Sequence, residues 1–258
     1  MKIEWLIEEE DLDRIRELIK SQSNNPFVKK RIERTVDSRH LPDFEKGRFW
    51  EAMVACLTTT QQRAGPDSAV TRFCSKKPFP LSLRDCLLSA NSLSHFVENT
   101  LTGFGGLRRT RTIGKEVEHN FRWLSSNGWA EIEKIANDLI KCRKGEPAIK
   151  DIPIERKAAN FVAGKLKGFG PKQSRNLWQT LGLFRFEIPI DSRITKWLNT
   201  NGFPFKLSAT ALADNNYYEF VMDGIQELCM KCGVLPCILD AAIFSSFDQE
   251  WAEDKLIW

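Results

Sequence analysis

The chain has 258 residues, of which 42% are hydrophobic and 28% are charged. This composition is typical of globular proteins, and the length suits one compact domain or two lobes that share a cleft. There is no run of about 18 apolar residues that could span a membrane. The acidic stretch Glu8–Glu10 near the N-terminus is unlike a secretory signal. We therefore expect an intracellular protein, cytoplasmic or nuclear, without a membrane partner.

The cysteine pattern bears on compartment and cofactors. The seven cysteines are scattered without the spacing of a disulfide framework, which is typical of a reducing compartment. Three of them form a C-x2-C-x4-C series from Cys229 to Cys237, but an iron–sulfur cluster needs four thiolates. The position seven residues before this series holds Met222, and a zinc site would need a distant ligand such as Cys142. The histidines show no ligand spacing: His40, His95 and His119. We expect free thiols, no metal and no cofactor.

The hydrophobic pattern predicts helices throughout the chain. Apolar residues recur every three or four positions in several segments, for example at Phe49, Met53 and Leu57. Prolines and glycines divide the chain into roughly ten helices of ordinary length. No segment shows the sustained alternation of a strand, although a strand pair near the N-terminus stays possible. The expected fold class is all-α.

One long stretch of the chain carries only positive charge. Such a run is either a solvated helix face or a surface that follows the phosphates of a nucleic acid. The net charge of +4 is too small to decide between them. Residues 156–186 contain no acidic residue and these basic ones: Arg156, Lys157, Lys165, Lys167, Lys172, Arg175 and Arg185.

Within this stretch the sequence predicts two helices joined by a tight turn. Residues 155–167 place apolar side chains on one helical face, and a Gly-Phe-Gly turn follows at 168–170. Pro171 suits the first position of the next helix, which would end at Gly182. A glycine turn beside a helix N-terminus leaves backbone amides uncovered, so it can bind a phosphate without reading sequence.

Lys172 lies in the first turn of the second predicted helix. The positive end of the helix dipole and three nearby cations disfavour a charged amine at this position, and a neutral amine is a nucleophile. These cations are Lys165, Lys167 and Arg175. The alternative is a lysine that only contacts phosphate.

Asp191 is the candidate partner of Lys172. The apolar segment Ile188–Ile190 leads into it, and a further helix follows. Asp191 could simply be the N-cap of that helix, a role that aspartate fills well. It follows Lys172 by 19 positions, however, which leaves room for one helix and a return loop. The two side chains could then meet across a cleft.

These residues together resemble a known signature. Leu166–Lys172, followed by Ile188–Asp191, is similar to the helix-hairpin-helix/Gly-Pro-Asp motif of the endonuclease III and 8-oxoguanine DNA glycosylase superfamily. In that motif the catalytic lysine lies two positions after the second glycine, and the catalytic aspartate follows 18 or 19 residues later, as Lys172 and Asp191 do here. Lys167 departs from the pattern, which usually has proline there.

The resemblance implies an all-α fold of two helical lobes flanking a DNA-binding cleft. A six-helix barrel would cover residues 48–186 and end in the helix-hairpin-helix, and residues 1–47 with 187–258 would form the second lobe. Lys172 and Asp191 would be catalytic. Contacts with the DNA backbone would come from Lys167, Gly168, Phe169, Gly170 and Arg175.

Three further positions resemble the family more weakly. Gln61 is a candidate for filling the gap left by an extruded base, or else a surface glutamine at a helix end. Leu239–Ser245 resembles the C-terminal helix of the 8-oxoguanine branch. Phe244 would then stack on the flipped base, and Asp240 would accept hydrogen bonds from guanine donors. Alternatively Phe244 belongs to the core and Asp240 is solvated.

The implied function is that of a bifunctional DNA glycosylase and AP lyase. It would act in base excision repair as a monomer, without a cofactor, on double-stranded DNA with a damaged base, 8-oxoguanine first. An oxidised-pyrimidine glycosylase of the endonuclease III type is one alternative. A non-catalytic helix-hairpin-helix DNA-binding module is the other.

Overall fold

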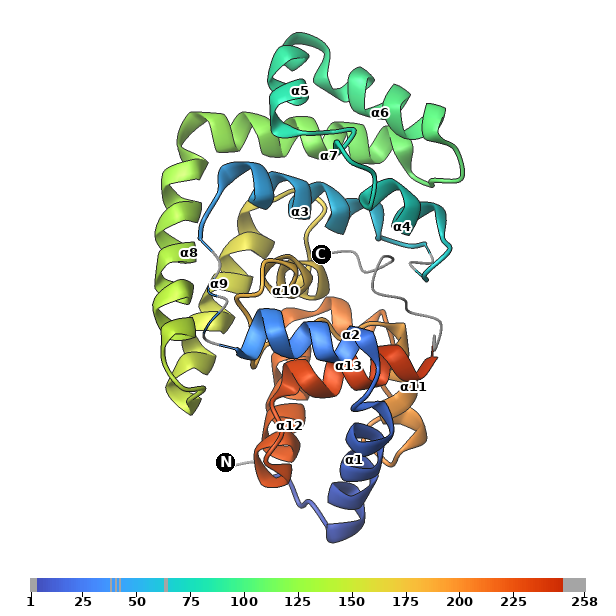
Figure 1. The fold of residues 1–258 in the computed structure, drawn as a ribbon, viewed down its shortest axis with the longest axis vertical. Coiled ribbons are helices and arrows are strands. Elements are labelled where there is room, and N and C mark those ends of the chain that lie inside the picture. The colour runs from blue at the N-terminus through green and yellow to red at the C-terminus, as the bar shows by residue number, and fades with distance from the viewer. Residues whose placement is uncertain (1–3, 38, 40, 42, 63–64, 248–258) are drawn as a thin grey trace.

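The computed structural model describes residues 4–37, 39, 41, 43–62 and 65–247. Every regular element among them is helical, which confirms the all-α class, and the strand pair considered near the N-terminus is not found in this part of the chain (Figure 1). The α-helices are α1 (Glu9–Gln22), α2 (Pro26–Arg31), α3 (Lys46–Thr58), α4 (Ala69–Cys74), α5 (Leu83–Leu88), α6 (Leu93–Phe104), α7 (Thr110–Trp123), α8 (Trp129–Lys144), α9 (Ile152–Lys165), α10 (Pro171–Thr180), α11 (Ser192–Thr200), α12 (Asn215–Cys232) and α13 (Pro236–Phe247).

The buried apolar side chains form two main clusters. The larger one is built mainly by α3 to α10 and runs from Phe49 to Phe184. The other combines Ile15 of α1 with residues between 188 and 243. Because α1 and α2 both pack against α13, the N-terminal segment joins the C-terminal helices in space (Figure 1).

Helix α3 carries the apolar pattern into the larger cluster. Phe49, Met53 and Leu57 recur at helical spacing and are fully buried. Removing each such side chain from water stabilises the fold by about 1.5–3 kcal/mol. The Trp50 indole nitrogen donates a hydrogen bond of 2.9 Å to the Leu81 carbonyl, which fastens α3 to the chain before α5. Helix α3 is therefore anchored in the larger cluster along most of its length.

The predicted hairpin is formed by α9 and α10. Its two helices are joined by a hydrogen bond of 3.1 Å from the Trp178 indole to the Ala158 carbonyl. Gly168 has a φ of +85°, and a Cβ there would lie 2.6 Å from Leu57. Asn120 fixes the backbone just before the turn. Its side chain accepts a hydrogen bond of 2.7 Å from the Lys167 amide and donates one of 3.0 Å to the Lys167 carbonyl. The turn therefore needs glycine at 168 for both conformation and space.

The chain leaves the hairpin through a buried, extended segment. Helix α10 ends before Gly182, whose φ of +76° reverses the chain direction. All residues from Leu183 to Ile190 are buried, and Asp191 then begins α11. This return brings Asp191 back toward the N-terminal end of α10.

Within the described ranges no single helix is long and apolar enough to cross a membrane. Only α12 and α13 taken together reach that length, and they are bent by 98° where they meet.

Candidate active site

The ends of several elements surround a cavity of about 1450 Å³. Its lining comes from the end of α3, the hairpin turn, α10, the segment around Asp191, α11, α13 and α2. Most of the candidate residues meet there: Gln61, Gly168, Gly170, Lys172, Asp191, Asp240 and Phe244. Residues more than 200 positions apart in the sequence thus share one cavity.

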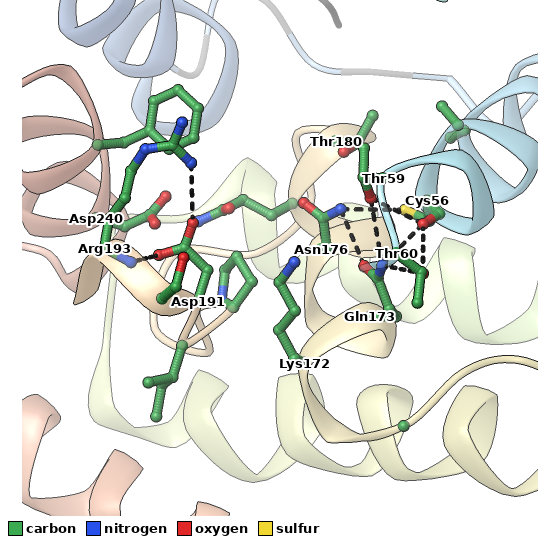
Figure 2. A pocket seen from close by; sticks show the side chains of 18 of the residues that line it. Cys56, Thr59, Thr60, Lys172, Gln173, Asn176, Thr180, Asp191, Arg193 and Asp240 are labelled. Atoms are coloured by element: carbon green, nitrogen blue, oxygen red, sulfur yellow. Dashed lines mark hydrogen bonds and ion pairs between the residues drawn. The ribbon is translucent and has the colours of Figure 1, made fainter. Parts of the chain in front are cut away.

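Lys172 is the second residue of α10 and is half-buried. Figure 2 shows its amine pointing into the cavity, with Asp191 on one side and Gln173 and Asn176 on the other. The thiol of Cys56 lies close by and accepts a hydrogen bond of 3.4 Å from the Asn176 amide. Burial raises the pKa of Cys56 to about 12, against the opposing charge of Lys172. The thiol therefore stays protonated, which makes it a poor nucleophile at this point.

Asp191 is the N-cap of α11 and also faces the cavity. Its Oδ1 accepts hydrogen bonds from the amides of Arg193 at 2.8 Å and Ile194 at 3.0 Å. Its Oδ2 lies 3.4 Å from the Arg193 guanidinium. The N-cap role considered for Asp191 is thus present, and it leaves the second carboxylate oxygen only weakly engaged, because 3.4 Å is long for a hydrogen bond.

Asp240 lies on α13 at the far side of the cavity from Lys172 (Figure 2), and Phe244 of the same helix also lines the cavity. The Asp240 side chain is buried and 3.4 Å from the buried guanidinium of Arg31 on α2. Burial raises the pKa of Asp240 to about 6, with Asp191 adding to the rise while Arg31 and Lys172 oppose it. The expected alternative of a solvated Asp240 is therefore wrong.

Phe244 is half-buried between two partners. Its ring is stacked on Phe27 with a centroid distance of 4.7 Å and an interplanar angle of 18°. The Arg193 guanidinium lies over the same ring, 4.2 Å from the centroid. Two groups this close cannot share one face, so both faces of the Phe244 ring are covered. Sequence reasoning missed Arg193, although it directly follows the Asp191 segment.

Gln61 lies at the exposed turn that follows α3. Its φ of +58° is in the left-handed region, which residues other than glycine seldom adopt because it is strained for them. The chain just before Gln61 is bound by Gln173, the neighbour of Lys172, whose side-chain amide donates hydrogen bonds to the Cys56 carbonyl at 2.8 Å and the Thr60 hydroxyl at 2.7 Å. The side chain of neighbouring Gln62 accepts a hydrogen bond of 3.0 Å from the Arg108 amide. The turn carrying Gln61 is therefore fastened to the helix of Lys172, a link that the sequence did not indicate.

The residues expected to contact the DNA backbone differ in how exposed they are. Gly170 and Lys167 are exposed, Gly168 is half-buried and the Phe169 side chain belongs to the core. Within the part of the chain that the structure describes, no acceptor pairs with the Gly170 amide. An exposed amide of this kind beside the start of a helix suits an anion.

Arg175 corrects the expectation of a phosphate contact. Its side chain is fully buried and its Nε lies 2.6 Å from a carboxylate oxygen of Glu187. Arg185 is likewise buried, 3.0 Å from Asp151. The basic stretch therefore does not lie on the surface as a whole, because some of its arginines neutralise buried carboxylates that come from outside the stretch.

No group of three or more His, Cys, Asp or Glu side chains suited to a metal is found among the described residues. All seven cysteines are free thiols, and burial raises the pKa of Cys237 to about 12. His40 lies outside the described residues.

Comparison of the sequence with models of known protein families and with curated proteins finds no match. Solved structures of similar fold include the following three. The first is the 8-oxoguanine DNA glycosylase of Methanocaldococcus jannaschii, with 17% identity, a TM-score of 0.59, and coverage of 93% of this chain and 94% of that chain. The second is the 8-oxoguanine DNA glycosylase of Thermotoga maritima, with 14% identity, a TM-score of 0.59, and coverage of 92% and 96%.

The third is an 8-oxoguanine glycosylase/lyase of Methanocaldococcus jannaschii in complex with a 15mer DNA containing 8-oxoguanine. It has 14% identity, a TM-score of 0.58, and coverage of 89% of this chain and 95% of that chain. The chain therefore has, over nearly its whole length, the all-α helix-hairpin-helix fold of the 8-oxoguanine DNA glycosylases.

Proposed function

We propose that this protein is a base-excision-repair DNA glycosylase that removes 8-oxoguanine from duplex DNA and then cleaves the strand as a lyase. The observation that carries the proposal is that Lys172 and Asp191 line one cavity beside the hairpin turn. The fold likeness to 8-oxoguanine DNA glycosylases, one of them in complex with DNA containing this lesion, supports the same substrate. We expect the protein to act on DNA as a monomer.

The reaction uses Lys172 as the nucleophile. Its amine forms a bond to C1′ of the damaged nucleotide, and the C1′–N bond to the base breaks, with the electron pair leaving on the base, which takes up a proton. Opening of the sugar ring gives an imine between Lys172 and C1′. Removal of a proton from C2′ then expels the 3′ phosphate, so the strand is cut by β-elimination. These steps need no cofactor.

Asp191 stabilises the positive charge that develops on the sugar as the base leaves. Its Oδ1 is held by the two amides at the start of α11, which sets the direction of the carboxylate. Its Oδ2, 3.4 Å from Arg193, is free enough to face the charged sugar. The N-cap bonds thus position the carboxylate without consuming both oxygens.

The flipped base would enter the space between Asp240 and Phe244. The ionised Asp240 carboxylate accepts hydrogen bonds from N1–H and the exocyclic amino group of a guanine. Stacking of the base on Phe244 requires the Arg193 guanidinium to move from the ring that it now covers. Once moved, Arg193 remains a cation beside the sugar–phosphate chain, where a phosphate can replace Asp191 as its partner.

The duplex would lie across the cavity, between the lobe of residues 48–186 and the lobe of residues 1–47 with 187–258. The exposed amide of Gly170 and the side chain of Lys167 would grip a phosphate without reading sequence. Extruding a nucleotide costs a few kcal/mol of stacking and pairing, and Gln61 at its exposed turn would offset part of this by filling the gap.

Two alternatives predict different outcomes. An oxidised-pyrimidine glycosylase would use the same Lys172 and Asp191 but prefer thymine glycol, because its base pocket would not depend on Asp240. A non-catalytic DNA-binding module would bind duplexes through the hairpin and release no base. The side chains of Lys172 and Asp191 lining one cavity favour an enzyme over the module.

The test is a panel of labelled duplexes, each with one lesion, incubated with the protein and resolved on a denaturing gel. We expect 8-oxoguanine to be released faster than thymine glycol or uracil. Borohydride should trap a covalent complex in the wild type but not in Lys172→Gln. Lys165→Gln, which removes an exposed lysine of the same basic stretch, is the matched control and should trap normally. Trapping that survives Lys172→Gln and disappears with another lysine would refute the assignment.

A further inference from the structure

Lys172 and Asp191 are carried by separate pieces of backbone. Lys172 lies in the first turn of α10, whereas Asp191 follows the extended segment Ile188–Ile190. Catalysis by two groups requires that their separation be held closely, and a misplacement of about 1 Å can reduce a rate by about 100-fold. Some feature of the fold must therefore fix the helix of Lys172 to the segment of Asp191.

Arg175 holds the start of the helix that carries Lys172. It lies one helical turn after Lys172, is fully buried, and its Nη1 donates a hydrogen bond of 3.0 Å to the carbonyl of Pro171, the residue before Lys172. Its Nε is 2.6 Å from Glu187 on the outgoing segment. Glu187 is also 2.9 Å from Arg156 of α9, so the carboxylate joins both helices of the hairpin to the segment that leads to Asp191.

Tyr218 of α12 (Asn215–Cys232) holds the backbone segment that leads to Asp191. Its hydroxyl donates to the Ile188 carbonyl at 2.8 Å and accepts from the Ile190 amide at 2.6 Å, so it holds both ends of the segment before Asp191. Burial raises the pKa of Tyr218, and the hydroxyl therefore keeps the proton that it donates. The backbone directly before Asp191 is thus tied to a side chain from another helix.

The two residues meet in the interior. The Arg175 guanidinium lies over the Tyr218 ring, 4.4 Å from its centroid, and both side chains are fully buried. A chain of contacts therefore runs from the Pro171 carbonyl through Arg175 and Tyr218 to the Ile190 amide. Each end of this chain of contacts lies one residue away from a proposed catalytic group.

We infer that Arg175 and Tyr218 are positioning residues that set the separation between the Lys172 amine and the Asp191 carboxylate. The inference rests on the proposed function. A purely structural role for a buried pair would affect how many molecules are folded. A positioning role affects how fast each folded molecule reacts, so the two are separable by measurement.

Tyr218→Phe is the principal test, because it keeps the ring under Arg175 and removes only the hydroxyl that holds the Asp191 segment. The assay is single-turnover release of 8-oxoguanine, with the end-point of borohydride trapping as a count of active molecules. We expect the rate to fall about 10–100-fold, while the trapping end-point and duplex affinity stay at wild-type values. Tyr217→Phe is the matched control, since it removes the neighbouring hydroxyl on the same helix, and its rate should equal that of the wild type.

Arg175→Lys is the second variant, for use if Tyr218→Phe lowers the folded fraction at the assay temperature. Lysine keeps the charge beside Glu187 but loses the planar stack and the fork that reaches the Pro171 carbonyl. It should slow base release to a similar degree. The double variant should be little slower than either single variant, because the two side chains act as one unit.

Two outcomes would overturn parts of this picture separately. An active wild type with unchanged rates in both variants, or with a loss of end-point alone, would show that the pair is only structural. A wild type that releases no base and traps no complex would instead remove the proposed function, and the positioning inference with it.

Discussion

The carboxylate of Asp240 lies 3.4 Å from the guanidinium of Arg31, and only 7% and 5% of the two side chains are exposed. Arg31 comes from α2 and Asp240 from α13, so this ion pair joins the N-terminal segment to the C-terminal helix at the edge of the cavity. Removing either partner would leave a buried charge without its counter-ion, which is costly in a dry interior. The protonation of Asp240 therefore affects both stability and the proposed recognition of a base.

The first prediction concerns activity and pH. Because the pKa of Asp240 is about 6, its carboxylate becomes protonated below that pH and loses acceptor capacity toward guanine donors. Release of 8-oxoguanine should therefore decline as the pH falls through about 6. Single-turnover rates measured across about pH 5–8 test this. The Asp240→Asn variant should release the base more slowly at neutral pH, and its rate should not decline near pH 6. If the rate of the variant declines in the same way, the titrating group is not Asp240.

The second prediction concerns stability and pH. The pKa of Asp240 is about 6 in the folded protein and 3.8 in an ordinary carboxyl, so the folded state holds the proton more tightly. The stabilisation from this proton is fully present below the ordinary pKa and is lost as the pH rises through about 6. The unfolding free energy of the wild type relative to Asp240→Asn should fall by up to about 3 kcal/mol over this interval. Denaturant melts of both proteins at each pH measure the difference, which must vary with pH for the assignment to hold.

The third prediction concerns the base pocket. Phe244→Ala removes the ring on which the flipped base would stack, and the loss should be about 1–3 kcal/mol in transition-state stabilisation. Binding to undamaged duplex should stay unchanged, because the Phe244 ring is enclosed by Phe27 and Arg193. A melting curve must accompany the kinetics, since loss of the Phe27 contact also destabilises the packing of α2 on α13. Equal losses for damaged and undamaged DNA would mean that Phe244 belongs only to the core.

The fourth prediction contrasts two glycines of one turn. Gly168→Ala should destabilise the fold, because φ is +85° and the new Cβ would lie 2.6 Å from Leu57. Gly170→Ala should leave the melting temperature nearly unchanged, because no heavy atom beyond the two adjacent residues lies within 4 Å of the new Cβ. The methyl group at 170 should nevertheless weaken binding to all duplexes alike, since phosphate contacts carry no sequence information. Unchanged affinity in a folded Gly170→Ala protein would make the hairpin a structural turn only.

The fifth prediction concerns the strained turn. Gln61→Gly relieves a left-handed backbone with φ of +58°, so stability should stay equal or rise by about 1 kcal/mol. Release of 8-oxoguanine from a paired duplex should still slow down, because nothing then fills the vacated stack. The loss should be smaller when the lesion lies opposite an abasic site, where less stacking is broken. An equal loss on both duplexes would argue against gap filling by Gln61.

Local chemistry made the centre of this site predictable. Three residues of the site have effects that reach only a few positions along the chain, through backbone conformation and helix capping: Gly168, Pro171 and the N-cap Asp191. Such local effects can be predicted from the sequence. The apolar periodicity of segments such as α3 likewise predicted the all-α class, because one face of each helix must be buried. Lys172 could be singled out for the same reason, as the lysine beside a glycine turn at the start of a helix.

Only the tertiary structure decided which charged and aromatic side chains face the cavity and which are buried. Arg175 is equivalent to its basic neighbours in the sequence, yet Glu187 and Tyr218 enclose it in the interior. The Arg31–Asp240 pair depends on α2 packing against α13, a contact between opposite ends of the chain. No local rule selects such partners, because the energy of a buried charge depends on distant groups that only the folded chain brings within a few ångströms.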